Sequence, residues 1–365
     1  MSGLKSFVRQ RVWAREGIDG KLAWMALWPL SVLFGVAIRL RSGAYAIGIF
    51  RAAKAALPVV SVGNLSVGGA GKTPFSLWLA GELQRRGRHP AIVLRGYGGS
   101  ARQATVVASE GSVLTTVEAV GDEAIMLGRR FSGVVVAARR RSEGAAVAQA
   151  QGCDVVVLDD GFQHRRLARD CDIVLVTSSR ASLLPAGPLR EPRSALRRAD
   201  AVVRVRKGGE GPGDLGVVAA PVFEATFAAT ALVESVQGEW QERPLGLLAG
   251  RRVATVSGIA DPGPFHDMVR QWEAEIVEMI ALEDHHNYTV EDWRRIANQT
   301  RQVDLVLTTE KDLVKLEVFP FARKKLLALR IAPAVEGGTE LVDLVCARIE
   351  RAGQGGEHGD KSRTA

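Results

Sequence analysis

From Leu57 onward, short apolar runs alternate with segments of helical periodicity. The first run, Leu57 to Val62, has the pattern of a buried strand, and a helical pattern follows from Thr73 to Leu83. Five later runs have the same strand pattern: Ala91 to Leu94, Gly133 to Ala137, Asp154 to Leu158, Asp172 to Val176 and Ala201 to Val205. This alternation predicts an α/β fold in which a parallel sheet is wound with helices.

A second, smaller α/β lobe is predicted after the glycine-rich stretch from Lys207 to Gly216. Val222 to Leu232 and Glu239 to Leu247 have the pattern of antiparallel strands, which would form a hinge. Further alternation follows in this order: a strand at Val253 to Ser257, a helix opened by Asp261 and Pro262, a strand at Ile276 to Ile280, a helix from Thr289 and a strand at Leu305 to Thr308. We expect an N-terminal segment at 1–45, a core α/β domain at 46–216, a second α/β lobe with the hinge strands at 217–345 and a disordered tail at 346–365.

Seventeen uncharged residues, LAWMALWPLSVLFGVAI, lie between Lys21 and Arg39. The run is at the short end for a helix that crosses a bilayer, and it contains a proline and a glycine. A span, a helix lying in the membrane interface and a helix packed on the protein's own core all remain open. A cleaved signal peptide is disfavoured, because Arg39 and Arg41 separate the apolar run from the cleavage-like Ala44 to Ala46. We predict that residues 1–45 associate with a membrane.

The positive charge is concentrated in the same region. The chain of 365 residues is 47% apolar and 24% charged, as in globular proteins, and has a net charge of +8. Residues 1–54 hold nine Lys or Arg against only Glu16 and Asp19, which favours the anionic cytoplasmic leaflet. No basic stripe interleaved with aromatic residues occurs elsewhere, so we expect no nucleic-acid partner. The three cysteines have neither metal-ligand nor disulfide spacing, which fits a reducing compartment: Cys153, Cys171 and Cys346.

The stretch from Ser61 to Phe75, SVGNLSVGGAGKTPF, is typical of a phosphate-binding loop between a strand and a helix. Its glycines let backbone amides approach a phosphate, Lys72 can reach the β- and γ-phosphates, and the Thr73 hydroxyl can ligate magnesium. The predicted nucleotide-binding residues are Gly68, Gly69, Ala70, Gly71, Lys72 and Thr73. Ser66 stands where the strict pattern has glycine, and a glycine-rich turn that binds nothing is the alternative.

Two adjacent carboxylates, Asp159 and Asp160, end the strand predicted at Asp154 to Leu158. In a fold with a phosphate-binding loop, the neighbouring strand delivers an acid to the magnesium ion, so one of the two should bind or order the cation. Period-two alternation would point them in opposite directions unless the strand has already ended. Helix capping is the alternative for this pair.

Two further clusters contain acids or histidines just before predicted helices. Asp122 follows Gly121 at a helix start, where the helix dipole alone favours an acid. His285 and His286 lie beside acids, but adjacent histidines seldom ligate one metal and no third ligand is suitably spaced. We therefore reject a zinc site and favour a proton-transfer or phosphate-facing role for the histidines, with helix capping by Thr289 or Asn287 nearby.

Two loops contain weaker signals. Arg190 and Glu191 follow a proline-rich turn, and the arginine can clamp a phosphate. The segment from Thr308 to Asp312 follows a strand, as base-reading loops do, but Thr-x-x-Asp also makes a helix N-cap. These two interpretations of the second loop carry equal weight.

Taken in order, the motifs resemble those of the tetraacyldisaccharide 4′-kinase (lipid A 4′-kinase) family. The matching segments are Gly63–Asn64, Gly68–Pro74, Arg95–Gly99, Gly121–Glu123, Asp159–His164, Pro188–Pro192, Asp284–Tyr288 and Thr309–Asp312. Ser66 is shared with that family's loop, and Ala124, where the family more often has proline, is a small departure. The resemblance implies transfer of the ATP γ-phosphate, with magnesium, to the 4′-hydroxyl of a tetraacylated glucosamine disaccharide 1-phosphate. It places the protein on the cytoplasmic face of the bacterial inner membrane, and we expect a monomer.

The resemblance also implies roles for individual residues. Lys72 and Thr73 would hold phosphates and magnesium, and Asp160 with Glu191 would belong to the metal-facing shell. Asp122 would be the base that takes the hydroxyl proton, polarised by a histidine for which we choose His286. Arg190 would offset phosphate charge, as phosphoryl transfer requires. Two other functions remain open: a membrane-associated P-loop NTPase that acts as a maturation or regulatory switch, and a non-catalytic membrane adaptor.

Overall fold

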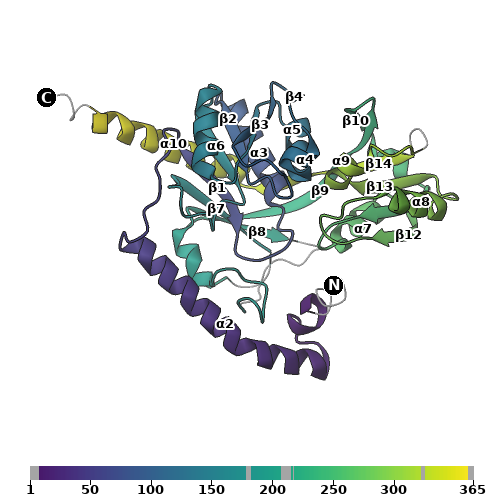
Figure 1. Cartoon of the computed structure of the whole chain (residues 1–365), viewed down its shortest axis with the longest axis horizontal. Helices are drawn as coiled ribbons and strands as arrows, with labels where there is room; N and C mark the ends of the chain where they lie inside the picture. The colour runs from purple at the N-terminus through teal and green to yellow at the C-terminus, as the bar shows by residue number, and fades with distance from the viewer. Residues whose placement is uncertain (1–7, 178–181, 207–214, 217, 322–324, 361–365) are drawn as a thin grey trace. The chain divides into compact units, whose positions relative to one another are not determined.

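A computed structural model describes residues 8–177, 182–206, 215–216, 218–321 and 325–360 (Figure 1). It confirms the α/β class: parallel strands alternate with helices along most of the chain. The chain divides into two compact units. Unit 1 comprises Met1–Lys72, Asp160–Ala225 and Val335–Ala365, and unit 2 comprises Thr73–Asp159 and Thr226–Ala334. The part boundaries expected from the sequence remain a prediction.

In the described part of unit 1, strands β1 (Val59–Asn64), β7 (Cys171–Val176) and β8 (Ala201–Arg206) are parallel. Strand β1 pairs with β7, and β7 pairs with β8. Every residue of β1 and β7 is buried, as expected for strands covered on both faces. Helix α10 (Gly338–Asp360) packs against β1 and β7.

Helix α10 differs from the expected disordered tail. The sequence predicted disorder over 346–365, whereas the helix continues to Asp360, and 361–365 lie outside the described residues. Buried Leu341, Val345 and Ile349 fix the first turns of the helix. Because propagation of a helix is far less costly than its nucleation, the glycine-containing continuation can remain helical.

The apolar N-terminal segment forms helix α2 (Gly17–Ala46), preceded by a short π-helix, η1 (Val8–Val12). Among the described residues, α2 is the one helix long and apolar enough to cross a membrane, and only 11% of its apolar window is buried. Large apolar side chains are exposed along its length: Leu22, Met25, Trp28, Leu30, Leu33, Val36 and Leu40. A helix packed on the protein's own core is therefore not what the structure shows.

Within unit 1, α2 contacts the segment 182–190 through its few buried residues. The Ser31 hydroxyl donates to the carbonyl of Leu183 at 3.0 Å and accepts from the amide of Ala186 at 2.9 Å. One turn later, a Cβ on Gly35 would lie 2.8 Å from the end of the Leu183 side chain, so this side chain would have to shift if the helix had a larger residue there. The indole of Trp13 donates to the carbonyl of Pro185 at 3.0 Å. These contacts dock the helix on the segment.

The same segment is bonded to the end of β1. The amide of Val67 donates to the carbonyl of Pro188 at 2.8 Å, and the amide of Arg190 donates to the carbonyl of Leu65 at 2.7 Å. An isolated antiparallel bridge joins Ser66 to Leu189. The backbone of segment 182–190 is thus hydrogen-bonded to α2 at Leu183 and Ala186, and to the phosphate-binding loop at Pro188 and Arg190.

Unit 2 contains two groups of strands. In the first group, β6 (Val155–Asp159), β2 (Pro90–Leu94) and β5 (Val134–Ala137) are parallel in that order, and β3 (Thr105–Ser109) and β4 (Ser112–Val113) continue antiparallel. The helices of this part are α3 (Lys72–Arg85), α4 (Val117–Val120), α5 (Asp122–Arg130) and α6 (Arg141–Ala150). The predicted strands match within two residues, while β3 and β4 were not expected.

The second group contains β12 (Glu275–Ala281), β11 (Arg252–Ser257), β13 (Leu305–Thr309) and β14 (Leu326–Glu336), parallel in that order. Its helices are α7 (Gly263–Arg270), α8 (Val290–Gln299) and α9 (Glu310–Leu316). Strands β9 (Val222–Val236) and β10 (Glu239–Arg243) are antiparallel, as predicted. The expected second strand ends early: Pro244 follows it, and the 3₁₀-helix η3 (Leu245–Leu248) buries Leu245 and Leu248. A second 3₁₀-helix, η2 (Arg193–Arg198), precedes β8.

We expect Ser31→Ala to loosen segment 182–190. The substitution leaves the buried Ala186 amide without its partner, which costs about 1–3 kcal/mol, whereas the Leu183 carbonyl keeps its hydrogen bond from the amide of Gly187. Amide hydrogen exchange should become faster at Ala186 and Gly187, and the free energy of unfolding should fall by that amount. Ser42→Ala on the same helix is the matched control and should change neither. Equal exchange at Ala186 in the two variants would contradict the docking role of Ser31.

Candidate functional site

The phosphate-binding loop lies between β1 and α3, as predicted. Gly68 and Gly71 have φ values of 109° and 75°, a region that side-chain-bearing residues rarely adopt. Ser66 instead forms the bridge to Leu189, so its backbone is extended and does not need glycine. This explains why serine is accommodated where the strict loop pattern has glycine.

In unit 1, one carboxylate holds two cations beside the loop. Asp160 lies 3.6 Å from Lys72 Nζ and 3.1 Å from Arg190 Nη1. Asp160 has a φ of 53°, because β6 has ended at Asp159 and the chain turns there. Period-two alternation therefore does not extend to the second acid. The structure brings together the predicted Lys72, Asp160 and Arg190.

In unit 2, the first acid of the pair contacts the first turn of α3. Thr73 Oγ1 donates to Asp159 Oδ2 at 2.8 Å, and Ser76 Oγ donates to Asp159 Oδ1 at 3.1 Å. Asp159 is 4% exposed. Hydroxyl and carboxylate oxygens are the ligands that Mg²⁺ prefers, and that ion commonly uses one or two carboxylates with substrate phosphates and water. The donor set of Thr73 and Asp159 thus fits magnesium.

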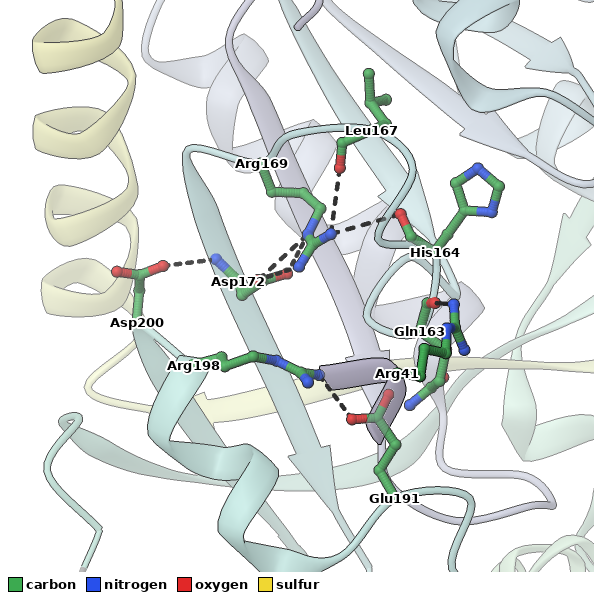
Figure 2. A network of polar contacts seen from close by, with 9 residues as sticks. All are labelled: Arg41, Gln163, His164, Leu167, Arg169, Asp172, Glu191, Arg198 and Asp200. Carbon is green, nitrogen blue, oxygen red and sulfur yellow. Dashed lines mark hydrogen bonds and ion pairs between the residues drawn. The ribbon is translucent and has the colours of Figure 1, made fainter. Parts of the chain in front are cut away.

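The predicted metal-shell residue Glu191 has a different neighbour. Its carboxylate, 3% exposed, accepts from Arg198 Nη2 at 2.8 Å (Figure 2). The Arg198 guanidinium also lies 4.4 Å from the centre of the Phe162 ring. Among the residues that the structure describes, no group of three or more His, Cys, Asp or Glu side chains is arranged to hold a metal ion. Glu191 is thus neutralised by an arginine rather than grouped with other acids.

Asp122, the predicted base, is buried at the first turn of α5. It is 5% exposed, and its carboxylate lies 2.9 Å from Lys315 Nζ and 3.4 Å from His285 Nδ1. The turn before it requires glycine: Gly121 has a φ of 88°, and a Cβ there would lie 2.1 Å from the carbonyl of Tyr97. The motif Arg95–Gly99 therefore packs against the turn that aims Asp122.

The structure separates the two adjacent histidines. The sequence favoured His286, but His285 is the one beside Asp122, and His286 Nε2 lies 2.8 Å from Asp292. His285 has a φ of 60°, which turns consecutive side chains to different partners. Asp292 forms a capping box with Thr289 at the start of α8, as the helix-cap interpretation of Thr289 predicted.

Helix α9 contributes two lysines, Lys311 and Lys315, for which the sequence motifs predicted no role. Lys315 donates to the carbonyl of His286 at 2.8 Å besides pairing with Asp122, and Lys311 donates to Asp284 at 3.0 Å. The two lysines are four residues apart, so they lie on one face of the helix. That spacing after the Thr309–Asp312 motif is the signal that could have identified Lys315. Ser76, three residues after Thr73, could have been found by the same periodicity.

The segment Thr309–Asp312 forms an N-cap, as one of its two interpretations predicted. The Thr309 side chain accepts from the amide of Asp312, and the Asp312 carboxylate accepts from the Thr309 hydroxyl and from the amide of Gly258. Helix α9 is also tied to α5 by Arg129–Glu317 and Arg130–Glu310 ion pairs of 2.7 and 2.9 Å. These contacts bring the lysines of α9 to Asp122.

The charges around Asp122 determine its protonation. Burial alone raises the pKa of Asp122, but the hydrogen bond with His285 and the charges of Lys315 and Lys311 outweigh it and hold the pKa well below its usual range. The hydrogen bond with Asp122 raises the pKa of His285 against the opposing effect of burial. Burial, followed by the charge of Asp159, raises the pKa of Glu123. Asp122 is therefore an ionised acceptor at neutral pH, held by cationic neighbours.

We expect Lys315→Met to raise the pKa of Asp122. The variant removes a cation that stabilises the carboxylate, so the pKa should move up toward the ordinary value of about 3.9. A depressed pKa in the folded state stabilises the protein above the pKa of the unfolded chain, and this contribution is lost as pH falls. The variant should therefore lose less stability on acidification. Carboxyl NMR titration measures the pKa directly, with Lys325→Met as the control; an unchanged Asp122 titration would contradict the assignment.

Comparisons with known proteins identify the family of this chain. The family model described as tetraacyldisaccharide-1-P 4′-kinase matches residues 23–350. A tetraacyldisaccharide 4′-kinase of Anaeromyxobacter dehalogenans (strain 2CP-1) is 41% identical over 335 residues, covering 87% of this chain and 86% of the relative. One from Geobacter sulfurreducens is 40% identical over 309 residues, covering 82% and 86%.

Among solved structures, the LpxK of Aquifex aeolicus, crystallised in complex with ATP, is similar with a TM-score of 0.76 and 31% identity. The match covers 90% of this chain and 99% of that one. The family model and the curated relatives each span most of the chain, and the fold agrees over the same extent. This chain therefore belongs to the tetraacyldisaccharide 4′-kinase family.

Proposed function

We propose that this protein transfers the γ-phosphate of ATP to the 4′-hydroxyl of a tetraacylated glucosamine disaccharide 1-phosphate, a reaction of lipid A biosynthesis. The observation that carries the proposal is the buried, ionised Asp122 held by His285 and Lys315 in a chain of this kinase family. A kinase needs a group that accepts a hydrogen bond from the acceptor hydroxyl, and a buried carboxylate kept charged by fixed cations has that property.

The nucleotide is bound by the phosphate-binding loop. Backbone amides from Gly68 to Gly71 face the phosphates, and Lys72 offsets their charge. Asp160 pairs with Lys72 and Arg190 in the described structure, which keeps both cations beside the loop. An arriving triphosphate competes for these cations, so Arg190 and Lys72 can pass from the carboxylate to phosphate oxygens.

Thr73 with an acid of the Asp159–Asp160 pair would hold the magnesium ion. The family resemblance implies Asp160 and Glu191 as metal-shell residues, but the hydroxyl–carboxylate contact of Thr73 favours Asp159. When bound, the ion neutralises the charge that develops on the phosphate oxygens. Asp160 then positions the two cations, and Glu191 positions Arg198 against Phe162.

The acceptor hydroxyl is oriented by Asp122. Its pKa is held low by His285 and Lys315, so it is a weak base and accepts a hydrogen bond from the hydroxyl early in the reaction. Such a group suits a loose phosphoryl-transfer transition state, in which the nucleophile retains its proton until late. His285 stabilises the carboxylate and is the histidine that acts, rather than His286.

Helix α2 brings the protein to the membrane that contains the lipid acceptor. The exposed apolar residues of this helix enter the interface, and the basic residues around them bind the anionic cytoplasmic leaflet. The protein then acts as a monomer on the cytoplasmic face of the inner membrane. A substrate with four acyl chains does not diffuse freely to a soluble enzyme, which is the physical reason for such an anchor.

Asp122→Asn should abolish transfer to the disaccharide lipid while leaving ATP affinity near normal. The amide cannot accept the hydroxyl proton, and general-base groups contribute about 10²–10⁴-fold to rate. The measurement is transfer of radiolabel from γ-labelled ATP to the lipid, with nucleotide binding followed separately. Asp267→Asn, at an exposed acid of α7, is the control. Undiminished transfer would remove Asp122 from the role, and acceptor-independent ATP hydrolysis without any labelled lipid would favour the regulatory switch.

Asp159→Asn should raise the magnesium concentration needed for half-maximal transfer by about tenfold, since it replaces a charged oxygen ligand by a neutral one. Asp160→Asn should affect ATP affinity more than the magnesium requirement, because Asp160 positions Lys72 and Arg190. Magnesium titrations at saturating ATP separate the two effects. The reverse pattern would restore Asp160 as the metal ligand.

A further inference from the structure

Unit 1 contains an unusually long stretch without acidic residues. No Asp or Glu occurs between Asp19 and Glu82, whereas the same stretch holds six basic residues: Lys21, Arg39, Arg41, Arg51, Lys54 and Lys72. Lys72 belongs to the phosphate-binding loop. Positive charge without local carboxylates favours an anionic ligand, and the tertiary structure shows where this charge gathers.

Two more arginines join the stretch through backbone pairing. The amide of Ala53 donates to the carbonyl of Arg166 at 2.7 Å, and the amide of Ala168 donates to the carbonyl of Ala53 at 2.8 Å. The chain around Ala53 therefore runs beside the loop that follows the Asp159–His164 motif. This pairing places Arg166 beside Ala53, and it holds the loop whose Arg165 lies over the ring of Tyr45 in the last turn of α2.

One aromatic ring of α2 lies beside two of these guanidinium groups. The guanidinium carbon of Arg165 is 4.5 Å from the centre of the Tyr45 ring, and that of Arg41 is 6.0 Å from it. Arg41 Nη2 also donates to the main-chain carbonyl of Gln163 at 3.0 Å, as Figure 2 shows. Stacking on an aromatic face orients an arginine with its remaining N–H groups in one plane.

The carboxylates of this region are already engaged with other groups. Asp172 pairs with Arg169 and Glu191 pairs with Arg198 (Figure 2), and Asp170 accepts from the amide of Val59. Neither Arg41 nor Arg165 has a carboxylate partner among the residues that the structure describes. Burial, with the charges of Arg198 and Arg169, lowers the pKa of Arg165 against the smaller opposing effect of the Glu191 carboxylate, so an anion bound at Arg165 would offset the remaining repulsion.

The pair also lies close to the phosphate-binding strand. Gln163, whose carbonyl binds Arg41, donates through Nε2 to the carbonyl of Asn64 at 2.7 Å, the last residue of β1. Gln163 therefore connects Arg41 to β1, the strand that precedes the phosphate-binding loop. An anion bound by Arg41 and Arg165 would lie near this strand and at the end of α2.

We propose that Arg41 and Arg165 form a subsite for a phosphate group carried by a lipid headgroup. This subsite rests on the proposed function, because the acceptor itself carries a 1-phosphate; the phosphate of a bilayer lipid is the other source of the same chemistry. The planar N–H groups of two guanidiniums match the oxygens of a phosphate and bind them bidentately. Binding at this subsite places a lipid headgroup beside the phosphate-binding loop.

The test compares acceptors with and without the 1-phosphate in mixed micelles, using the full-length protein. Arg165→Gln and Arg41→Gln should raise KM for the 1-phosphorylated acceptor by about tenfold, the loss of one charge-assisted contact, and leave kcat within about twofold. Neither variant should change KM for the acceptor that lacks the 1-phosphate. Arg165→Lys keeps the charge but lacks the planar guanidinium. Its KM for the 1-phosphorylated acceptor should therefore lie between those of the wild type and Arg165→Gln.

Arg197→Gln is the matched control, since Arg197 is an exposed arginine of η2 and its loss changes the net charge by the same amount. A second arm measures sedimentation with phosphatidylcholine vesicles, with and without phosphatidylglycerol. Weaker sedimentation of Arg165→Gln only in vesicles with phosphatidylglycerol assigns the phosphate to the bilayer. A KM effect confined to the 1-phosphorylated acceptor assigns it to the substrate.

Equal KM values for wild type and Arg165→Gln on both acceptors, together with equal sedimentation in both vesicle types, would overturn the subsite. An equal rise in KM on both acceptors without a vesicle effect would overturn it as well, since the loss would then be independent of phosphate. If the wild type labels neither acceptor, the proposed function fails, while the vesicle arm still tests the two arginines.

Discussion

A carboxylate that is both buried and ionised is the constraint on which unit 2 depends. Removing a charge from water is costly unless fixed partners compensate it, and Asp122 obtains these partners from the loop that holds His285 and from Lys315 of α9. Helix α5 must therefore stay packed on α9, and the Arg129–Glu317 and Arg130–Glu310 pairs hold the two helices together. The geometry that keeps Asp122 charged is thus also what joins two distant parts of the sequence.

A comparable arrangement organises unit 1. Asp160 holds Lys72 and Arg190 beside the phosphate-binding loop, and the backbone of segment 182–190 is bonded both to that loop and to Ser31 of α2. The helix that exposes its apolar side chains and the glycine-rich loop therefore contact the same stretch of backbone. Because backbone hydrogen bonds tolerate little displacement, the position of α2 and the position of Arg190 are physically connected.

Much of the fold could be predicted from local pattern. Buried strands such as β1 and β6 are continuous apolar runs, and helix starts such as that of α8 carry a capping threonine, so both are visible in a few residues. The helical continuation to Asp360 was missed because glycine-rich composition indicates disorder, whereas a packed first half can sustain a helix. Strand β10 ended before its predicted limit because Pro244 and the burial of two leucines favoured a 3₁₀ turn.

The sequence by itself determined the chemistry that is available: a glycine-rich loop ending in Lys72 and Thr73, paired acids at a strand end, and an apolar segment flanked by basic residues. These features depend on neighbours in the chain, so they can be recognised without a structure. Only the tertiary structure decided that Asp159 contacts Thr73, that His285 rather than His286 faces Asp122, and that Lys315 completes the charge balance. The physical reason is that each of these pairings joins residues far apart in sequence, and long-range packing, not local preference, selects among equivalent neighbouring side chains.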